Sequence, residues 1–183
     1  MKSRFRRRLH FPHNSATSSV FVRPVEEDGA PPRAADRKGF LGTAFDMQLQ
    51  LALVCDHAEQ TADGKLNIRG VFNDLAAPGF PAKHDMVLVM AMEWSRDDIG
   101  HYDFDVEVTG PSGQSTMTIK GHSEVDRRDP ESPPARTQIV MPLREIVFPE
   151  PGAYRFRIRI KGRDYDGPSL FLMKLEPPAS PTA

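Results

Sequence analysis

The sequence has very little cysteine and no long apolar run. Cys55 is the only cysteine among 183 residues, so no disulfide can form within the chain, and a domain built on disulfides is excluded. The longest apolar run, Met86–Met92, is far shorter than the roughly 20 residues that a membrane-spanning helix needs. These absences predict a cytoplasmic protein with no membrane partner.

The chain also lacks the motifs of metal sites and of common catalytic sites. No pair among its histidines has the spacing of zinc ligands, and no glycine-rich phosphate loop or nucleophile elbow occurs. Cys55 and His57 could share a face of a strand, but free cysteine is usually a buried apolar group, and we interpret Cys55 as a core residue. We therefore expect no cofactor and no enzymatic activity.

The whole chain has almost no excess of either charge, since its formal net charge is −1. The charge is unevenly distributed between residues 1–46 and the rest of the chain. Residues 1–46 carry 9 Lys/Arg and 5 Asp/Glu, which gives +4. The remaining residues carry 24 − 9 = 15 Lys/Arg and 25 − 5 = 20 Asp/Glu, which gives −5. Because nucleic-acid binding depends on neutralising phosphates, the acidic part is not expected to bind nucleic acid.

The first 46 residues sustain neither a two-residue nor a 3.6-residue apolar period, so they are predicted to be a disordered extension. No apolar stretch follows their arginines as it would in a secretory signal. Met47 stands directly before the first convincing strand, and we hypothesise that it is the physiological start. The proline-rich end, residues 176–183, is predicted to be a disordered tail.

Residues 47–175 alternate apolar and polar side chains between turn signals, which predicts strands. About eight strands are expected, over residues 47–57, 66–75, 85–94, 102–108, 115–125, 137–148, 154–161 and 169–175. Gly70 predicts a bulge or a close backbone approach, and Pro142 predicts an edge strand or a bulge. Eight strands with short turns favour an all-β antiparallel sandwich, immunoglobulin-like or C2-like, over a closed barrel.

Charged side chains form two rows on the expected strands. The basic row consists of Arg155, Arg157, Arg159 and Lys161, and an acidic row consists of Asp103, Asp105 and Glu107. The basic row is a candidate surface for an acidic partner. Alternatively, each row is a solvated face that pairs with the other within a sheet or across a dimer.

Acidic residues in two turns offer a weak candidate calcium site. Calcium takes six to eight oxygen ligands, and some sandwich modules gather loop carboxylates at one end. The candidate ligands are Asp97, Asp98, Asp164 and Asp166. They are also ordinary turn residues.

Three segments resemble an uncharacterised bacterial family of short, single-domain proteins of unknown function. They are Leu53-Val54-Cys55-Asp56-His57-Ala58, Gly64-Lys65-Leu66-Asn67-Ile68-Arg69-Gly70-Val71-Phe72 with the later Phe80-Pro81, and Glu150-Pro151-Gly152-Ala153-Tyr154-Arg155-Phe156. The resemblance covers about residues 47–175. It implies a β-sandwich in the bacterial cytosol and carries over no catalytic residue.

Three functions are compatible with these observations. We expect a non-catalytic interaction or scaffold module that binds a protein partner or forms a homo-oligomer through sheet faces or edges. The second alternative is a calcium- or carbohydrate-binding sandwich that uses the loops near Asp97 and Asp164. The third is an enzyme of unrecognised type.

Overall fold

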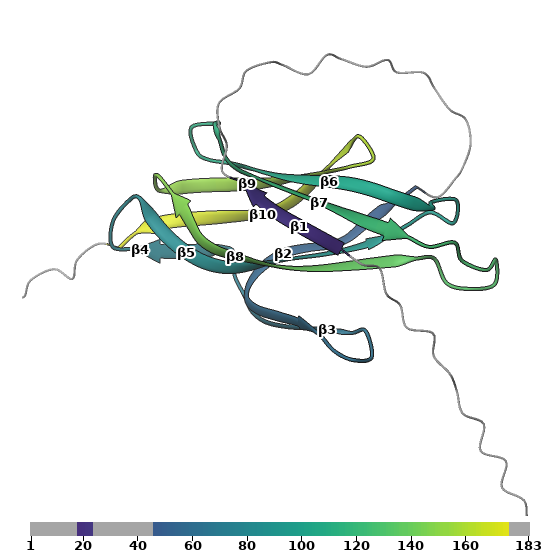
Figure 1. Cartoon of the computed structure of the whole chain (residues 1–183). Helices are drawn as coiled ribbons and strands as arrows, with labels where there is room; N and C mark the ends of the chain where they lie inside the picture. Colours follow the sequence, from purple (N-terminus) through teal and green to yellow (C-terminus); the bar gives the residue numbers. More distant parts are fainter. Residues whose placement is uncertain (1–17, 24–45, 176–183) are drawn as a thin grey trace, which may run out of the picture.

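The computed structural model describes residues 18–23 and 46–175, which form ten β-strands in two layered sheets (Figure 1). The six-stranded sheet has the order β1, β7, β6, β9, β10, β4, and these strands span Ser18–Arg23, Ser115–Val125, Gly100–Thr109, Gly152–Ile160, Arg163–Lys174 and Asp74–Ala77. The four-stranded sheet has the order β3, β2, β5, β8, and these strands span Leu66–Val71, Gln48–Gln60, Ala82–Glu93 and Arg136–Phe148. The predicted all-β sandwich is confirmed.

Alternation along each strand produces the two layers. On β9 the side chains of Tyr154, Phe156, Ile158 and Ile160 are buried, and the arginines between them are exposed. Successive side chains of a strand point to opposite faces, so one face of each sheet is apolar and must be covered. The two apolar faces cover each other and form one core.

A series of side-chain hydrogen bonds crosses this core and joins the two sheets. The indole Nε1–H of Trp94, just after β5, donates to Thr137 Oγ1 on β8 at 2.8 Å. The same hydroxyl lies 2.9 Å from Ser123 Oγ on β7, in the other sheet. All three residues are buried, and these hydrogen bonds satisfy groups that would otherwise lack a partner in an apolar interior.

The strand expected over residues 66–75 is in fact two strands. β3 ends at Val71, and the chain then crosses to the other sheet, where β4 pairs with β10 in a parallel ladder. The second difference between prediction and structure is β1. The sequence predicted no regular structure before Met47, whereas the backbone of Ser18–Arg23 pairs antiparallel with β7. The rest of the expected extension and the expected tail lie outside the described residues.

The hairpin of β2 and β3 folds across the outer face of the four-stranded sheet, where Figure 1 shows β3 below the two layers. Gln60 Nε2, at the end of β2, donates to Gln138 Oε1 at 3.1 Å on β8, although β5 separates these strands in the sheet. The hairpin thereby helps to enclose a second apolar cluster around Cys55, Val87 and Val89. β5 is buried on both faces, as its apolar sequence predicted.

Two local predictions are confirmed. β8, which contains Pro142, is the edge strand of its sheet. Gly70 has a φ of +65°, and a Cβ there would lie 2.1 Å from the Asp56 carboxylate, so the backbone approaches that side chain closely.

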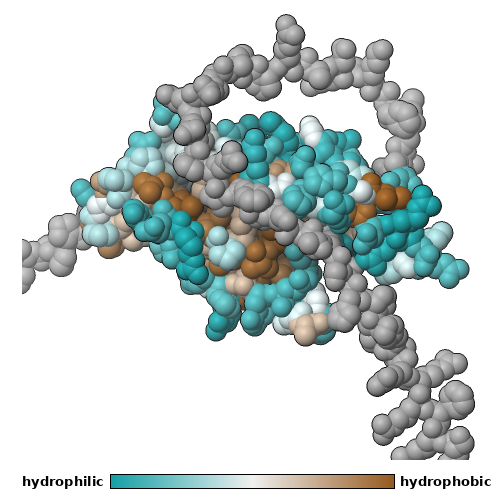
Figure 2. Space-filling model, in the orientation of Figure 1, coloured by the Kyte–Doolittle hydropathy of each residue, from teal (hydrophilic) through white to brown (hydrophobic). Residues whose placement is uncertain are grey.

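The flank of the sandwich where β1 and β8 form the sheet edges faces the viewer in Figures 1 and 2. Apolar residues form a band between the two layers on this side, and hydrophilic residues border the band.

Candidate functional site

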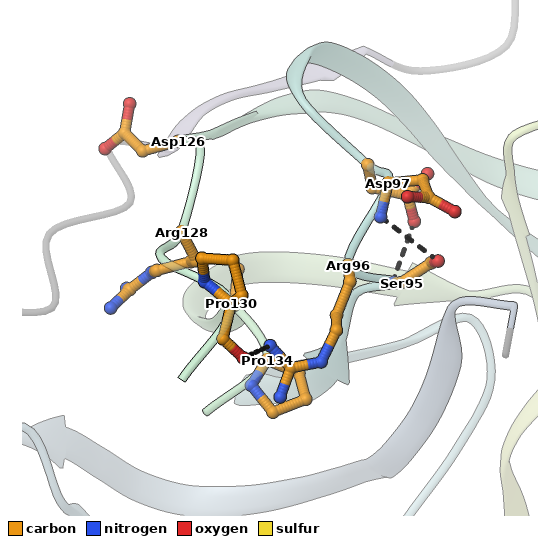
Figure 3. A pocket seen from close by; sticks show the side chains of 9 residues that line it. Ser95, Arg96, Asp97, Asp126, Arg128, Pro130 and Pro134 are labelled. Atoms are coloured by element: carbon orange, nitrogen blue, oxygen red, sulfur yellow. Dashed lines mark hydrogen bonds between the residues drawn. The ribbon is translucent and has the colours of Figure 1, made fainter. Parts of the chain in front are cut away.

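A pocket of about 270 Å³ lies between the loop after β5 and the loop before β8 (Figure 3). Arg96 crosses from one loop to the other and donates to the carbonyl oxygen of Pro130 at 2.7 Å. The walls combine charged and polar side chains with apolar ones, and they consist of Ser95, Arg96, Asp97, Asp98, Asp126, Arg128, Pro130, Pro134 and Ala135. A small polar ligand could occupy this space.

The Asp98 carboxylate, which lines this pocket, belongs to a partly buried network. Lys161 Nζ lies 2.5 Å from Asp98 Oδ1, and the backbone N–H of Ser95 donates to Oδ2 at 2.9 Å. The Tyr102 hydroxyl lies 3.3 Å from Oδ1, and the Tyr102 ring stacks on Trp94 with centroids 4.8 Å apart. Asp98 therefore ties the loop after β5 to the turn between β9 and β10.

The four candidate calcium ligands are not gathered at one point. Asp98 is bound to Lys161, Asp97 is exposed on the loop, and Asp164 accepts a hydrogen bond of 2.8 Å from Arg159 Nε. Asp166 is paired in register with Arg157. Within residues 18–23 and 46–175, no three His, Cys, Asp or Glu side chains are grouped as a metal site requires.

Lys161 does not belong to the basic row. It has a φ of +54° at the turn after β9, and its ammonium group reaches Asp98 instead of the outer face. Arg155, Arg157 and Arg159 do form a row on the outer face of the six-stranded sheet. Sequence alternation placed Lys161 with them because the pattern continues one residue beyond the strand.

Acidic residues flank the arginine row on both sides. Asp105 and Glu107 of β6 stand opposite Arg159 and Arg157, and Asp164 of β10 stands opposite Arg159 from the other side. The hydrogen bond from Arg159 lowers the pKa of Asp164. The pKa of Asp105 is raised because burial outweighs the attraction of Arg159 and Lys120. Most of this face is a ladder of opposite charges.

His101 lies at one end of the ladder between two carboxylates. Its Nδ1 lies 2.8 Å from Glu124 and its Nε2 lies 3.0 Å from Asp103, while its ring stacks on His122 with centroids 4.6 Å apart. The hydrogen bond with Glu124 raises the pKa of His101 most, and the hydrogen bond with Asp103 raises it further.

We expect His101 to make the stability of the domain depend on pH. A folded-state pKa above the unfolded value means that its stabilisation is complete below about pH 6.5, the ordinary histidine value, and is lost as pH rises through the folded pKa. Urea unfolding measured at several pH values above pH 6 should show this decline. The decline should be absent in the His101→Gln variant, and an identical pH profile in both proteins would contradict the assignment.

Cys55 is fully buried and is not a reactive thiol. Its Sγ–H points to the carbonyl oxygens of His57 at 3.5 Å and Val87 at 3.6 Å, and not to an imidazole. Burial raises its pKa, so little thiolate is present near neutral pH. The interpretation of Cys55 as a core residue agrees with this geometry.

An exposed apolar row at the end of β10, which includes the residue directly after the strand, escaped the sequence analysis. Phe171, Met173 and Leu175 are 52%, 49% and 52% exposed. They alternate with the buried Leu170 and Leu172, so they share the outer face of the six-stranded sheet. Register places Ala153 of β9 beside Phe171 and Ala76 of β4 beside Met173. We call Phe171, Met173 and Leu175 the β10 patch.

The fold and these surfaces define an all-β sandwich domain with a charge-paired outer face that ends in an apolar patch. The chain belongs to a family of unknown function, DUF6941, whose model matches residues 50–170. No curated protein matches the chain. In the part of the chain that the structure describes, no helix is long and apolar enough to span a membrane.

Proposed function

We propose that this protein is a non-catalytic interaction module that binds a partner protein through the β10 patch. The observation that carries this proposal is the exposure of three large apolar side chains at alternate positions, two at the end of β10 and one directly after it. Isolated apolar residues on a surface need no explanation, whereas a contiguous apolar patch on a soluble domain commonly marks an interface.

Arg155 and Arg157 make the surroundings of the patch suitable for a protein interface. Register places Arg155 beside Ser169 on β10, two residues from Phe171, and Arg157 is the next outward residue along β9. Thr109 and Ser169 stand opposite Arg155, so its guanidinium can meet a carboxylate of a partner. Arg157 stands between Glu107 and Asp166 and contributes to the charged border of the patch. Aromatic residues, methionine and arginine are enriched at protein interfaces.

A second candidate function is the binding of a small polar ligand such as a carbohydrate. The loop pocket beside Asp97 favours it, because polar groups from two loops converge there on about 270 Å³. A ligand that binds only the folded state raises the melting temperature. Such a rise with a panel of sugars, absent in the Arg96→Ala variant, would favour this candidate over the interaction module.

We also infer a bacterial, cytoplasmic protein with an immunoglobulin-like or C2-like strand arrangement. The buried free thiol of Cys55 supports a reducing compartment, because no disulfide contributes to the fold. The two-sheet architecture supports the comparison with these sandwiches.

The experiment compares two double variants of the full, affinity-tagged chain expressed in its native cells. Phe171→Ser with Met173→Ser removes most of the β10 patch, and Val71→Ser with Val147→Ser removes two exposed valines elsewhere. Co-purified proteins are quantified by mass spectrometry, and self-association is followed by light scattering. We expect the patch variant to lose its partner at least about tenfold, since residues central to an interface dominate its affinity, and the valine variant to keep it. Equal recovery from both variants would contradict the proposal.

A further inference from the structure

A cavity of about 320 Å³ borders the open edge of β4. Its walls come from β4, the following loop, the start of β5 and the core, namely Leu75, Ala76, Ala77, Pro78, Gly79, Pro81, Ala82, Lys83, His84, Phe148 and Leu172. Leu75 and Ala76 are neighbours on a strand and point to opposite faces of the sheet. A cavity that both residues line therefore lies along the edge of the sheet and not over one face.

The backbone of β4 has hydrogen-bonding groups to offer at this edge. The N–H of Phe171 donates to the carbonyl oxygen of Asn73, and the N–H of Leu175 donates to that of Ala77, both at 2.8 Å. Because backbone groups of a strand point alternately to either side, those of Asp74 and Ala76 point away from β10. No described strand lies on that side, since β4 ends the sheet.

We propose that the edge of β4 receives an extended segment of the partner protein, which adds to the six-stranded sheet as a further strand. This inference deepens the proposed function and rests on it. In strand addition, backbone hydrogen bonds supply affinity and pockets for alternate side chains supply specificity. Here the inward side chains of the added strand enter the cavity, and the outward ones lie beside Ala76 and the β10 patch.

The walls of the cavity define the chemistry of that segment. Leu75, Phe148 and Leu172 are apolar, so the inward position favours a leucine, isoleucine, methionine or phenylalanine. His84 also lines the cavity, and its Nε2 is buried without a hydrogen-bond partner among the described residues, so the wall offers one polar group as well. Lys83 lies at the cavity, and its exposed ammonium group is 3.5 Å from Glu145. Since β4 spans only Asp74–Ala77, few backbone bonds form and the complex is a weak, transient one.

The first test uses fluorescein-labelled peptides of eight residues that alternate leucine and threonine, with binding to the full chain followed by fluorescence anisotropy. We expect saturable binding. In an added strand, the N–H groups of all leucines point to one side and those of all threonines to the other. N-methylation of one of these two sets should therefore weaken binding at least about tenfold, and methylation of the other set should leave it within about twofold. Equal affinities of the two methylated peptides would overturn the proposal.

The second test changes the protein. Gly79 lines the cavity and a Cβ there meets nothing within 4 Å, so Gly79→Leu adds an apolar side chain at the cavity wall without a clash at its Cβ. Ala76→Pro removes an outward N–H and leaves the ladder with β10 intact. Both variants should keep the wild-type melting temperature and lose at least about tenfold in peptide affinity. Wild-type affinity in the Gly79→Leu variant would refute strand addition.

Three outcomes identify another occupant or separate the two proposals. Peptide binding that appears only after removal of residues 176–183 would show that this segment occupies the edge, and self-association lost in Gly79→Leu without peptide binding would show that a second copy does. Either result overturns the inference. If Phe171→Ser with Met173→Ser loses the cellular partner and Gly79→Leu keeps it, the interaction module stands and strand addition falls.

Discussion

Replacing Asp98 with alanine is expected to lower the free energy of unfolding by about 3 kcal/mol. The substitution removes the acceptor of the Ser95 N–H and leaves the partly buried Lys161 ammonium group with only the more distant Asp46 carboxylate, at 3.7 Å. The side chain of Asp98 is only 7% exposed and that of Lys161 is 26% exposed, so water compensates little for the lost contact. Urea unfolding followed by the fluorescence of Trp94 measures this change, since Trp94 is the only tryptophan.

A double-mutant cycle separates the ion pair from other effects of the substitution. Lys161→Met alone leaves the Asp98 carboxylate without its cation, and the combined Asp98→Ala and Lys161→Met variant has no unpaired charge. We expect the combined variant to be destabilised by clearly less than the sum of the two single variants. Additive effects would show that Asp98 and Lys161 do not interact in solution.

Replacing Thr137 with valine is expected to destabilise the domain by about 2–4 kcal/mol, although the two side chains have nearly the same shape. The Thr137 hydroxyl accepts a hydrogen bond from the Trp94 indole N–H and lies 2.9 Å from the Ser123 hydroxyl. Removing the Thr137 hydroxyl therefore leaves two buried polar groups without a partner. Equilibrium urea unfolding measures the loss. The emission maximum of Trp94 in the native state should shift as its hydrogen bond disappears.

Ser123→Ala is the matched control for this prediction. This substitution removes the Ser123 hydroxyl, but Thr137 keeps its hydrogen bond with Trp94, so Thr137 loses only one of its two partners. We expect a cost of about 1 kcal/mol, clearly below that of Thr137→Val. If the two variants were equally stable, the hydroxyl of Thr137 would not be the centre of the network.

The strand pattern was predictable because one buried face per sheet imposes a period of two on the sequence. β9 alternates apolar and arginine residues without interruption, and its structure follows that pattern residue by residue. The same rule failed at Lys161, since alternation does not register that the chain has entered a turn with a positive φ. Pro142 and Gly70 were informative because their backbone restrictions act at a single residue.

The β10 patch could not be predicted, because this strand is apolar on both faces. Leu170 and Leu172 are buried and Phe171 and Met173 are exposed, yet the four residues have the same chemical character in the sequence. Only the layer that covers one side distinguishes them. The cavity beside β4 was missed for a related reason, since residues 66–75 read as one strand and no local signal shows a crossing between sheets.

The sequence alone determined that residues 47–175 form strands, that the fold is a sandwich, and that charged rows occupy an outer face, because these features depend on neighbours one or two positions apart. The tertiary structure decided which apolar face stays uncovered, that acidic residues flank the arginine row, and that Asp98 binds Lys161 instead of joining the other acids. These outcomes depend on which strands lie side by side, and strand order is set by contacts between residues far apart in the chain.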